Sequence, residues 1–143
     1  MITSTANKNV KYVRSLHRRS VRHRERRFVV EGVRLVEEMI KAGQEPVFFF
    51  CTEDADSDSR AGTLIAQIRA SGVEPLLVSQ DVMQAMSDTQ TPQGILAVAD
   101  FPRIESLGSD LALVLDRVRD PGNLGTILRT AEAAGVGLVC TMR

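Results

Sequence analysis

The sequence predicts an α/β fold, because short apolar segments alternate with segments of helical periodicity along most of its length. The clearest case is residues 111–135, where five consecutive apolar residues precede a charged turn and a glycine-bearing helix start. Such an apolar run predicts a strand buried on both faces, as in a parallel sheet, and the following helix supplies the crossover that this sheet requires. Because ligands bind at the carboxyl ends of such strands, we expect a functional turn after residue 115.

Local signals place the other elements. Val10, Val13 and Leu16 form an apolar stripe that predicts a helix over residues 7–20. Gly43 marks a helix end and Ser79 a helix start. We expect strands at 28–30, 47–51, 76–78, 94–99, 111–115 and 137–141, and further helices at 32–42, 61–70, 80–86 and after residue 120.

The domain boundary is expected near residue 100. A length of 143 residues with 43% hydrophobic content allows one ordinary domain or two small ones. Pro102, Gly108 and two serines predict a linker over 101–110, between a domain at 1–100 and the start of another at 111–143. Residues 53–60 are expected to form an acidic loop, which lacks the glycine and closing Glu of a calcium loop, so no metal site is expected.

Positive charge is concentrated in the first 28 residues, which hold nine Lys and Arg against Glu25, a net of +8 in a chain of net charge zero. This asymmetry predicts a basic arm for RNA phosphates, although a solvated surface helix would carry the same charges. A mitochondrial presequence is a further candidate, but Glu25 and the direct continuation into residues 28–32 favour an intrinsic first helix. The candidate RNA-binding residues are Lys8, Lys11, Arg14, Arg18, Arg19, Arg22, Arg24, Arg26 and Arg27.

The cysteines, the histidines and the hydropathy of the chain support three further expectations. Cys51 and Cys140 fall in predicted strands and are expected to be buried, reduced apolar residues of a cytoplasmic protein. His17 and His23 lie in the basic segment, where we expect them to face RNA or solvent. No apolar stretch approaches the roughly 20 residues that span a bilayer, so no membrane association is expected.

The turn after residue 115 predicts an anion site. Asp120 and Asn123 are equally plausible N-caps around Pro121, and the residues leave that choice open. Leu124, Ile127, Leu128, Ala131 and Ala134 recur at helical spacing and are expected to face the sheet. Helical side chains lean toward the N-terminus, so Arg129 should point over Gly125, and with the helix amides and Arg119 it would present donors to a phosphate. A plain cap and a solvated arginine are the structural alternative.

This turn resembles the first motif of the SpoU/TrmH family of RNA ribose 2′-O-methyltransferases, which belong to the knotted SPOUT class. The string D-x-x-x-D-P-x-N-x-G-x-x-x-R-x-A matches without a spacing error. A dinucleotide fingerprint needs G-x-G-x-x-G, and a KH loop lies between two helices, so neither fits. The matching residues are Asp116, Asp120, Pro121, Asn123, Gly125, Arg129 and Ala131.

The first region resembles the same family. Its L30e-like substrate-binding domain typically carries F-V-V-E-G and T-P-Q-G-I, which are found at 28–32 and 91–95. From the residues themselves we expect structural roles here, with glycines in tight turns and Glu31 in a local hydrogen bond. The resemblance implies a small L30e-like α/β sandwich followed by the first β-α-β unit of a trefoil-knot methyltransferase domain.

The resemblance also implies an activity. The family transfers a methyl group from S-adenosyl-L-methionine to a ribose 2′-hydroxyl, and Asn123 and Arg129 match its catalytic positions, with Asp120, Pro121 and Gly125 supporting the motif. Ribosomal RNA is the favoured substrate and a homodimer the expected assembly. Because an arginine stays protonated, we expect Arg129 to orient a phosphate beside the target ribose, although the sequence leaves a role as base open.

The family's second and third motifs, which form its knot and cofactor pocket, have no counterpart in these 143 residues. We therefore expect the chain to be an N-terminal fragment that is inactive alone. The alternative interpretation is a noncatalytic RNA-binding module that keeps the L30e-like domain.

Overall fold

The computed structural model describes residues 1–57, 59–103 and 111–142, and the chain separates into two compact units, Met1–Pro102 and Arg103–Arg143. Helices and strands alternate in both, which confirms the predicted α/β class. In chain order the elements are α1 (Lys8–Leu16), α2 (Arg19–Glu25), β1 (Arg27–Glu31), α3 (Val33–Lys41), β2 (Phe48–Cys51), α4 (Glu53–Ser57), α5 (Ser59–Ala70), β3 (Leu76–Leu77), α6 (Gln80–Met86), β4 (Ile95–Asp100), β5 (Ala112–Asp116), α7 (Pro121–Ala133) and β6 (Leu138–Met142).

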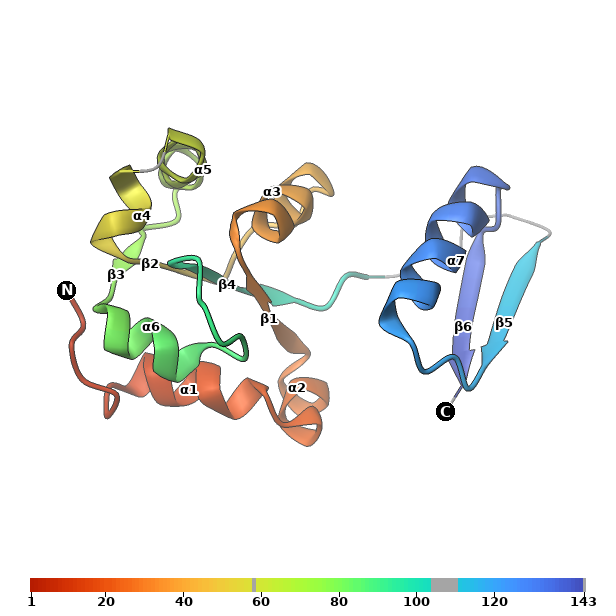
Figure 1. Ribbon diagram of the computed structural model, residues 1–143, viewed down its shortest axis with the longest axis horizontal. Helices are drawn as coiled ribbons and strands as arrows, with labels where there is room; N and C mark the ends of the chain where they lie inside the picture. Colours follow the sequence, from red (N-terminus) through yellow and green to blue (C-terminus); the bar gives the residue numbers. More distant parts are fainter. Residues whose placement is uncertain (58, 104–110, 143) are drawn as a thin grey trace. The chain divides into compact units, whose positions relative to one another are not determined.

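The first unit is built on a four-stranded sheet of order β1-β4-β2-β3. Strand β4 pairs antiparallel with both β1 and β2, while β2 and β3 are parallel. Helices cover both faces, α1 and α6 on one side and α3 and α5 on the other (Figure 1). Because side chains alternate along β4, Ile95 and Ala97 enter one core and Leu96 and Val98 enter the other.

The face covered by α1 and α6 carries the predicted apolar stripe, since Val10, Val13 and Leu16 are fully buried. The expectation of one helix over 7–20 is wrong, because α1 ends at Leu16 and α2 begins at Arg19. The chain turns there so that Val21 enters the same core, which the spacing of the first stripe did not anticipate. The predicted helix start at Ser79 is confirmed, because its hydroxyl accepts from the Val82 amide at 3.4 Å.

The opposite face packs α3, α4 and α5 on the sheet, with Leu64, Ile65 and Ile68 of α5 in its core. The expected acidic loop over 53–60 is wrong, since α4 spans Glu53–Ser57 and α5 begins at Ser59. Ala55 is 7% exposed and anchors α4 to this core. Acidic side chains are favourable in the first turn of a helix, so the composition that indicated a loop also suits a helix start.

The second unit pairs β5 with β6 in parallel through α7, in the predicted order of strand, helix and strand. Leu115 and Ala131 are buried where α7 meets the strands. The expectation that the first strand is buried on both faces is wrong for the described residues, since Leu111 is 51% and Val114 58% exposed. Helix α7 covers one face of the pair and leaves the other open (Figure 1).

The same open packing corrects three further expectations. Cys140 is exposed rather than buried, whereas Cys51 is buried as predicted. Leu128 and Ala134 are also exposed, because the narrow two-stranded sheet meets only part of the apolar side of α7. Of the expected linker 101–110, residues 104–110 lie outside the described part of the chain.

Candidate functional site

The basic segment, defined as the nine Lys and Arg between residues 8 and 27, lies on α1, α2 and the start of β1. The apolar stripe of α1 faces the core, which leaves the charged side chains of this helix on the solvent side. Five of the nine are exposed, and their side chains form no hydrogen bond or ion pair with the described residues. These five, called the free basic face below, are Lys8, Lys11, Arg14, Arg18 and Arg19.

The other four cations of the basic segment are engaged within the unit. Arg22 donates from Nη1 to the carbonyls of Leu16 at 2.9 Å and His17 at 2.6 Å, where α1 ends. Arg24 pairs with Glu25, and the guanidinium of Arg26 lies 5.1 Å from the centre of the Phe101 ring.

Arg27 is held from two sides. Its Nε donates to Asp100 Oδ1 at 2.8 Å and its Nη1 to Tyr12 Oη at 3.3 Å. The hydrogen bond to Asp100, followed by the one to Tyr12, raises the pKa of Arg27 above its ordinary value. This side chain therefore joins β1, β4 and α1 and is less available to a ligand than the free basic face.

His17 does not face solvent or RNA as expected. Its Nε2 lies 2.7 Å from the Met86 carbonyl oxygen and its Nδ1 lies 2.6 Å from Asp88 Oδ2. Both ring nitrogens are thus occupied at the junction between the end of α1 and the end of α6. His23 is exposed, and its ring lies edge-on to Phe101 at 5.8 Å.

In the second unit, Asp120 is the N-cap of α7. Its Oδ1 accepts from the Asn123 amide at 2.7 Å, and Pro121 occupies the first helical position. The choice left open by the sequence is thereby decided, and Asn123 lies inside the first turn with an exposed side chain. Asp120 suits the cap because its carboxylate satisfies a free amide and interacts favourably with the helix dipole.

Arg129 folds back along α7 as expected from helix geometry. Its Nη2 donates to Thr126 Oγ1 at 3.2 Å, and its Nη1 lies 3.4 Å from where a Cβ would stand at Gly125. Thr126 in turn donates to the Gly122 carbonyl at 3.0 Å. Sequence reasoning missed Thr126, although its position three residues before Arg129 on a helix could have indicated the contact.

The turn therefore brings Arg129, Gly125 and Thr126 together on the exposed surface at the start of α7. Asn123 lies in the same helical turn, while Arg119 is exposed and has no contact with these residues in the described chain. A guanidinium beside a helix N-terminus is an arrangement that binds phosphate oxygens.

The turn does not by itself form a pocket for S-adenosylmethionine, the cofactor that the sequence resemblance implies. Asp116, Gly122 and Asn123 are all exposed. What the described residues of the second unit supply is a cationic turn that can bind and orient an anion.

The segments 28–32 and 91–95 have the structural roles expected from their residues. Gly32 and Gly94 adopt φ of 91° and 73°, which glycine reaches without strain. Glu31 Oε1 accepts from Ser87 Oγ at 2.5 Å and Thr89 Oγ1 at 2.6 Å, which fastens the end of β1 to the loop after α6.

Membrane-spanning helices and metal centres are both absent from the described residues. Their helices are too short or too polar to cross a bilayer. No group of three or more His, Cys, Asp or Glu side chains among them has the geometry to hold a metal ion.

Comparison with known proteins gives one consistent family. A model of the MRM3-like substrate-binding domain matches residues 7–97. The 23S rRNA guanosine 2′-O-methyltransferase RlmP of Bacillus subtilis is 34% identical over 138 residues, covering 96% of this chain and 52% of the relative. The chain spans about half the length of this and another curated relative that it matches.

Solved structures that resemble this chain are methyltransferases as well. The crystal structure of an RNA 2′-O ribose methyltransferase superposes with a TM-score of 0.73 at 32% identity, covering 98% of this chain and 54% of the other. An rRNA methyltransferase from Sinorhizobium meliloti, solved with AdoMet bound, superposes with a TM-score of 0.73 at 30% identity and covers 98% of this chain and 53% of the other.

Proposed function

The chain belongs to the SpoU/TrmH family of RNA methyltransferases, and on that premise we propose that the protein methylates ribose 2′-hydroxyls of ribosomal RNA. S-adenosylmethionine is the family's cofactor, since a structural neighbour was crystallised with it. The observation that carries the proposal is the strand-turn-helix at residues 112–133, in which Arg129 lies over Gly125 as helix geometry predicts. The domain that carries the free basic face precedes this turn in the same chain.

The two regions have separate tasks in this proposal. Residues 1–100 bind the RNA, and residues 111–143 form the start of the methyltransferase domain. The free basic face contacts successive phosphates, because its exposed cations have no protein partner to give up among the described residues. Arg22, Arg24, Arg26 and Arg27 add to the positive field while they hold the unit together.

Arg129 is proposed to position the reacting nucleotide. A guanidinium stays protonated, so it binds a phosphate oxygen better than it abstracts the proton of a 2′-hydroxyl. Thr126 and the space above Gly125 keep its head group over the first turn of α7, where Asn123 also lies. Fixing the ribose in this way lowers the entropy cost of attack on a methyl donor.

RNA binding tests the first task. The double variant Lys11→Gln and Arg14→Gln should make the negative slope of log association constant against log salt concentration shallower by about 1.5 for an RNA hairpin. Each lost phosphate contact removes roughly 0.7–0.9 from the magnitude of this slope. The control is Lys41→Gln with Arg69→Gln, which removes the same charge from α3 and α5. Equal slopes for both double variants would refute the proposal that the free basic face contacts the RNA.

Methyl transfer tests the second task. Tritiated methyl transfer from S-adenosylmethionine to ribosomal RNA, measured with the full gene product, should be nearly abolished by Arg129→Ala, while Arg119→Ala retains it. RNA binding without any transfer by the parental protein would instead support a noncatalytic RNA-binding module, the alternative function. The proposal also includes action in the cytoplasm, with the ribosomal RNA of bacterial relatives as the guide, and assembly as a homodimer.

A further inference from the structure

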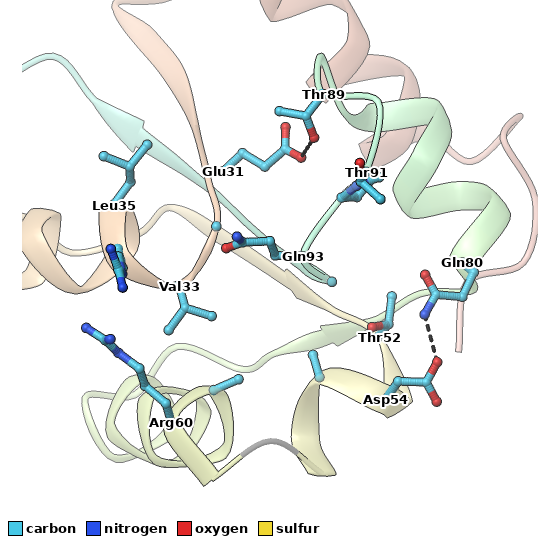
Figure 2. Close-up of a pocket in the computed structure, with 16 residues that line it drawn as sticks. Glu31, Val33, Leu35, Thr52, Asp54, Arg60, Gln80, Thr89, Thr91 and Gln93 are labelled. Atoms are coloured by element: carbon cyan, nitrogen blue, oxygen red, sulfur yellow. Dashed lines mark hydrogen bonds between the residues drawn. The ribbon is translucent and has the colours of Figure 1, made fainter.

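A cavity of about 740 Å³ opens in the first unit, away from the basic segment's own residues. Its walls come from the end of β1, the starts of α3, α4, α5 and α6, the residue after β2, and the loop 89–94 (Figure 2). This volume is within the range of about 300–1,000 Å³ that is typical of ligand sites. All of the lining residues fall within the segment 7–97 that matches a substrate-binding domain.

One wall of the cavity offers unpaired backbone donors. Helix α3 has nine residues, and its N-cap is Gly32, which supplies no capping side chain. The amides of Val33, Arg34 and Leu35 have no acceptor among the described residues, and the first turn contains no acidic side chain. Arg34 and Arg60 also line this cavity, and Arg60 is paired with Glu37. Arg34 and the free amides therefore suit the start of α3 to a phosphate group.

A second, independent feature is the hydroxyl of Thr52. The residue is 2% exposed, and its Oγ1 has no hydrogen-bond partner among the described residues. Thr52 lines the cavity, and Figure 2 shows its oxygen on the side toward Gln93. A buried hydroxyl without a partner is costly, and an acceptor or donor on a ligand would relieve that cost.

The remaining lining suits a flat, partly apolar group. Val33 and Leu35 are among the residues that line the cavity, and Leu35 is 61% exposed. The amide of Gln93 is exposed and has no partner among the described residues. A Cβ at Gly32 would stand 2.8 Å from Gln93 Oε1, so glycine keeps this amide beside the start of α3.

From these features we propose that the cavity binds one unpaired nucleotide of the RNA substrate. Its phosphate meets the α3 amides and Arg34, and its base lies against Leu35 with its polar edge toward Gln93 and Thr52. A base paired within a duplex is stacked and cannot enter, whereas a base in a loop is free to do so. This inference rests on the proposed function and adds to it a selectivity for unpaired RNA that the free basic face cannot supply.

The test compares two fluorescein-labelled RNAs of equal phosphate number, a hairpin with a seven-nucleotide loop and a blunt duplex. Leu35→Glu replaces the proposed apolar contact to the base with a negative charge in the first turn of α3, beside the amides proposed to bind the phosphate, and Gln67→Glu adds the same charge at an exposed site of α5. Thr52→Val removes the hydroxyl at nearly constant volume. Leu35→Glu and Thr52→Val should each weaken hairpin binding by about 10-fold and leave duplex binding unchanged, while Gln67→Glu changes neither.

The outcomes separate the two proposals. Equal affinity of the parental protein for hairpin and duplex, or equal losses for both RNAs in Leu35→Glu, would overturn the nucleotide site and leave the proposed function standing. Absence of binding to either RNA would overturn the proposed function itself. Melting curves recorded for each variant show that it is folded, and Leu35→Glu should melt with the parental protein because the side chain it replaces is exposed.

Discussion

Replacing Arg22 should destabilise the first unit, although the residue sits in a segment that resembles a simple basic arm. Its guanidinium donates to the carbonyls of Leu16 and His17, which have no further helical partner because α1 ends there. A hydrogen bond from a charged donor contributes about 1.5–3 kcal/mol when well shielded. Since this site is only partly buried, we expect Arg22→Ala to cost about 2 kcal/mol in total.

That loss corresponds to a fall in the melting temperature of about 8–16 °C for a domain of this size. Thermal unfolding followed by circular dichroism measures it, with Arg19→Ala as the matched control, because Arg19 is exposed and without a partner in the described chain. Arg22→Lys keeps the charge but loses the forked contact, so it should melt between the two and keep the parental salt dependence of RNA binding. Equal melting temperatures for Arg22→Ala and Arg19→Ala would refute the capping role.

Three further results are expected. Asp120→Ala removes the cap of α7 and should speed amide hydrogen exchange at Asn123 about fivefold, as for a loss of about 1 kcal/mol. Thr52→Val removes the unpartnered hydroxyl and should raise the free energy of unfolding by about 1 kcal/mol. Thr52→Ser keeps the hydroxyl and loses a methyl group, so it should lower the free energy of unfolding by about 1 kcal/mol. A destabilised Thr52→Val would mean that the hydroxyl has a hydrogen-bond partner. The hydrogen bond from Arg60 lowers the pKa of Glu37 below its ordinary value of 4.5. The stability that this pair contributes is therefore present above that pH and is lost as the pH falls through the lowered pKa. Between about pH 6 and pH 3 the melting temperature should fall less steeply for Glu37→Gln than for the parental protein.

The sequence predicted most elements because each had a local cause. The continuous apolar run of β4, the apolar stripe of α1, and the helix signals at Gly43 and Ser79 are all properties of neighbouring residues. The position of Arg129 over Gly125 was predictable for the same reason, since it follows from helix geometry alone. The functional roles of Asn123 and Arg129 remain predictions.

The errors occurred where burial depends on distant segments. Val114 and Cys140 are apolar and lie in strands, but their exposure depends on how many elements cover that face of the sheet. His17 looked like one more polar residue of the basic segment, yet it contacts Met86 and Asp88, about 70 positions away. Such contacts leave no periodic signal in the sequence.

The sequence by itself determined the α/β class, the family motif and the concentration of positive charge, because periodicity, spacing and charge are properties of the chain read in order. Only the tertiary structure decided which cations are free and which are engaged, since Arg22 and Arg27 find their acceptors through the packing of α1, β1 and β4. It also created the cavity around Thr52, whose walls come from segments between residues 31 and 94. A surface made from such separated segments exists only after the chain has folded, because long-range packing, and not local preference, brings its side chains together.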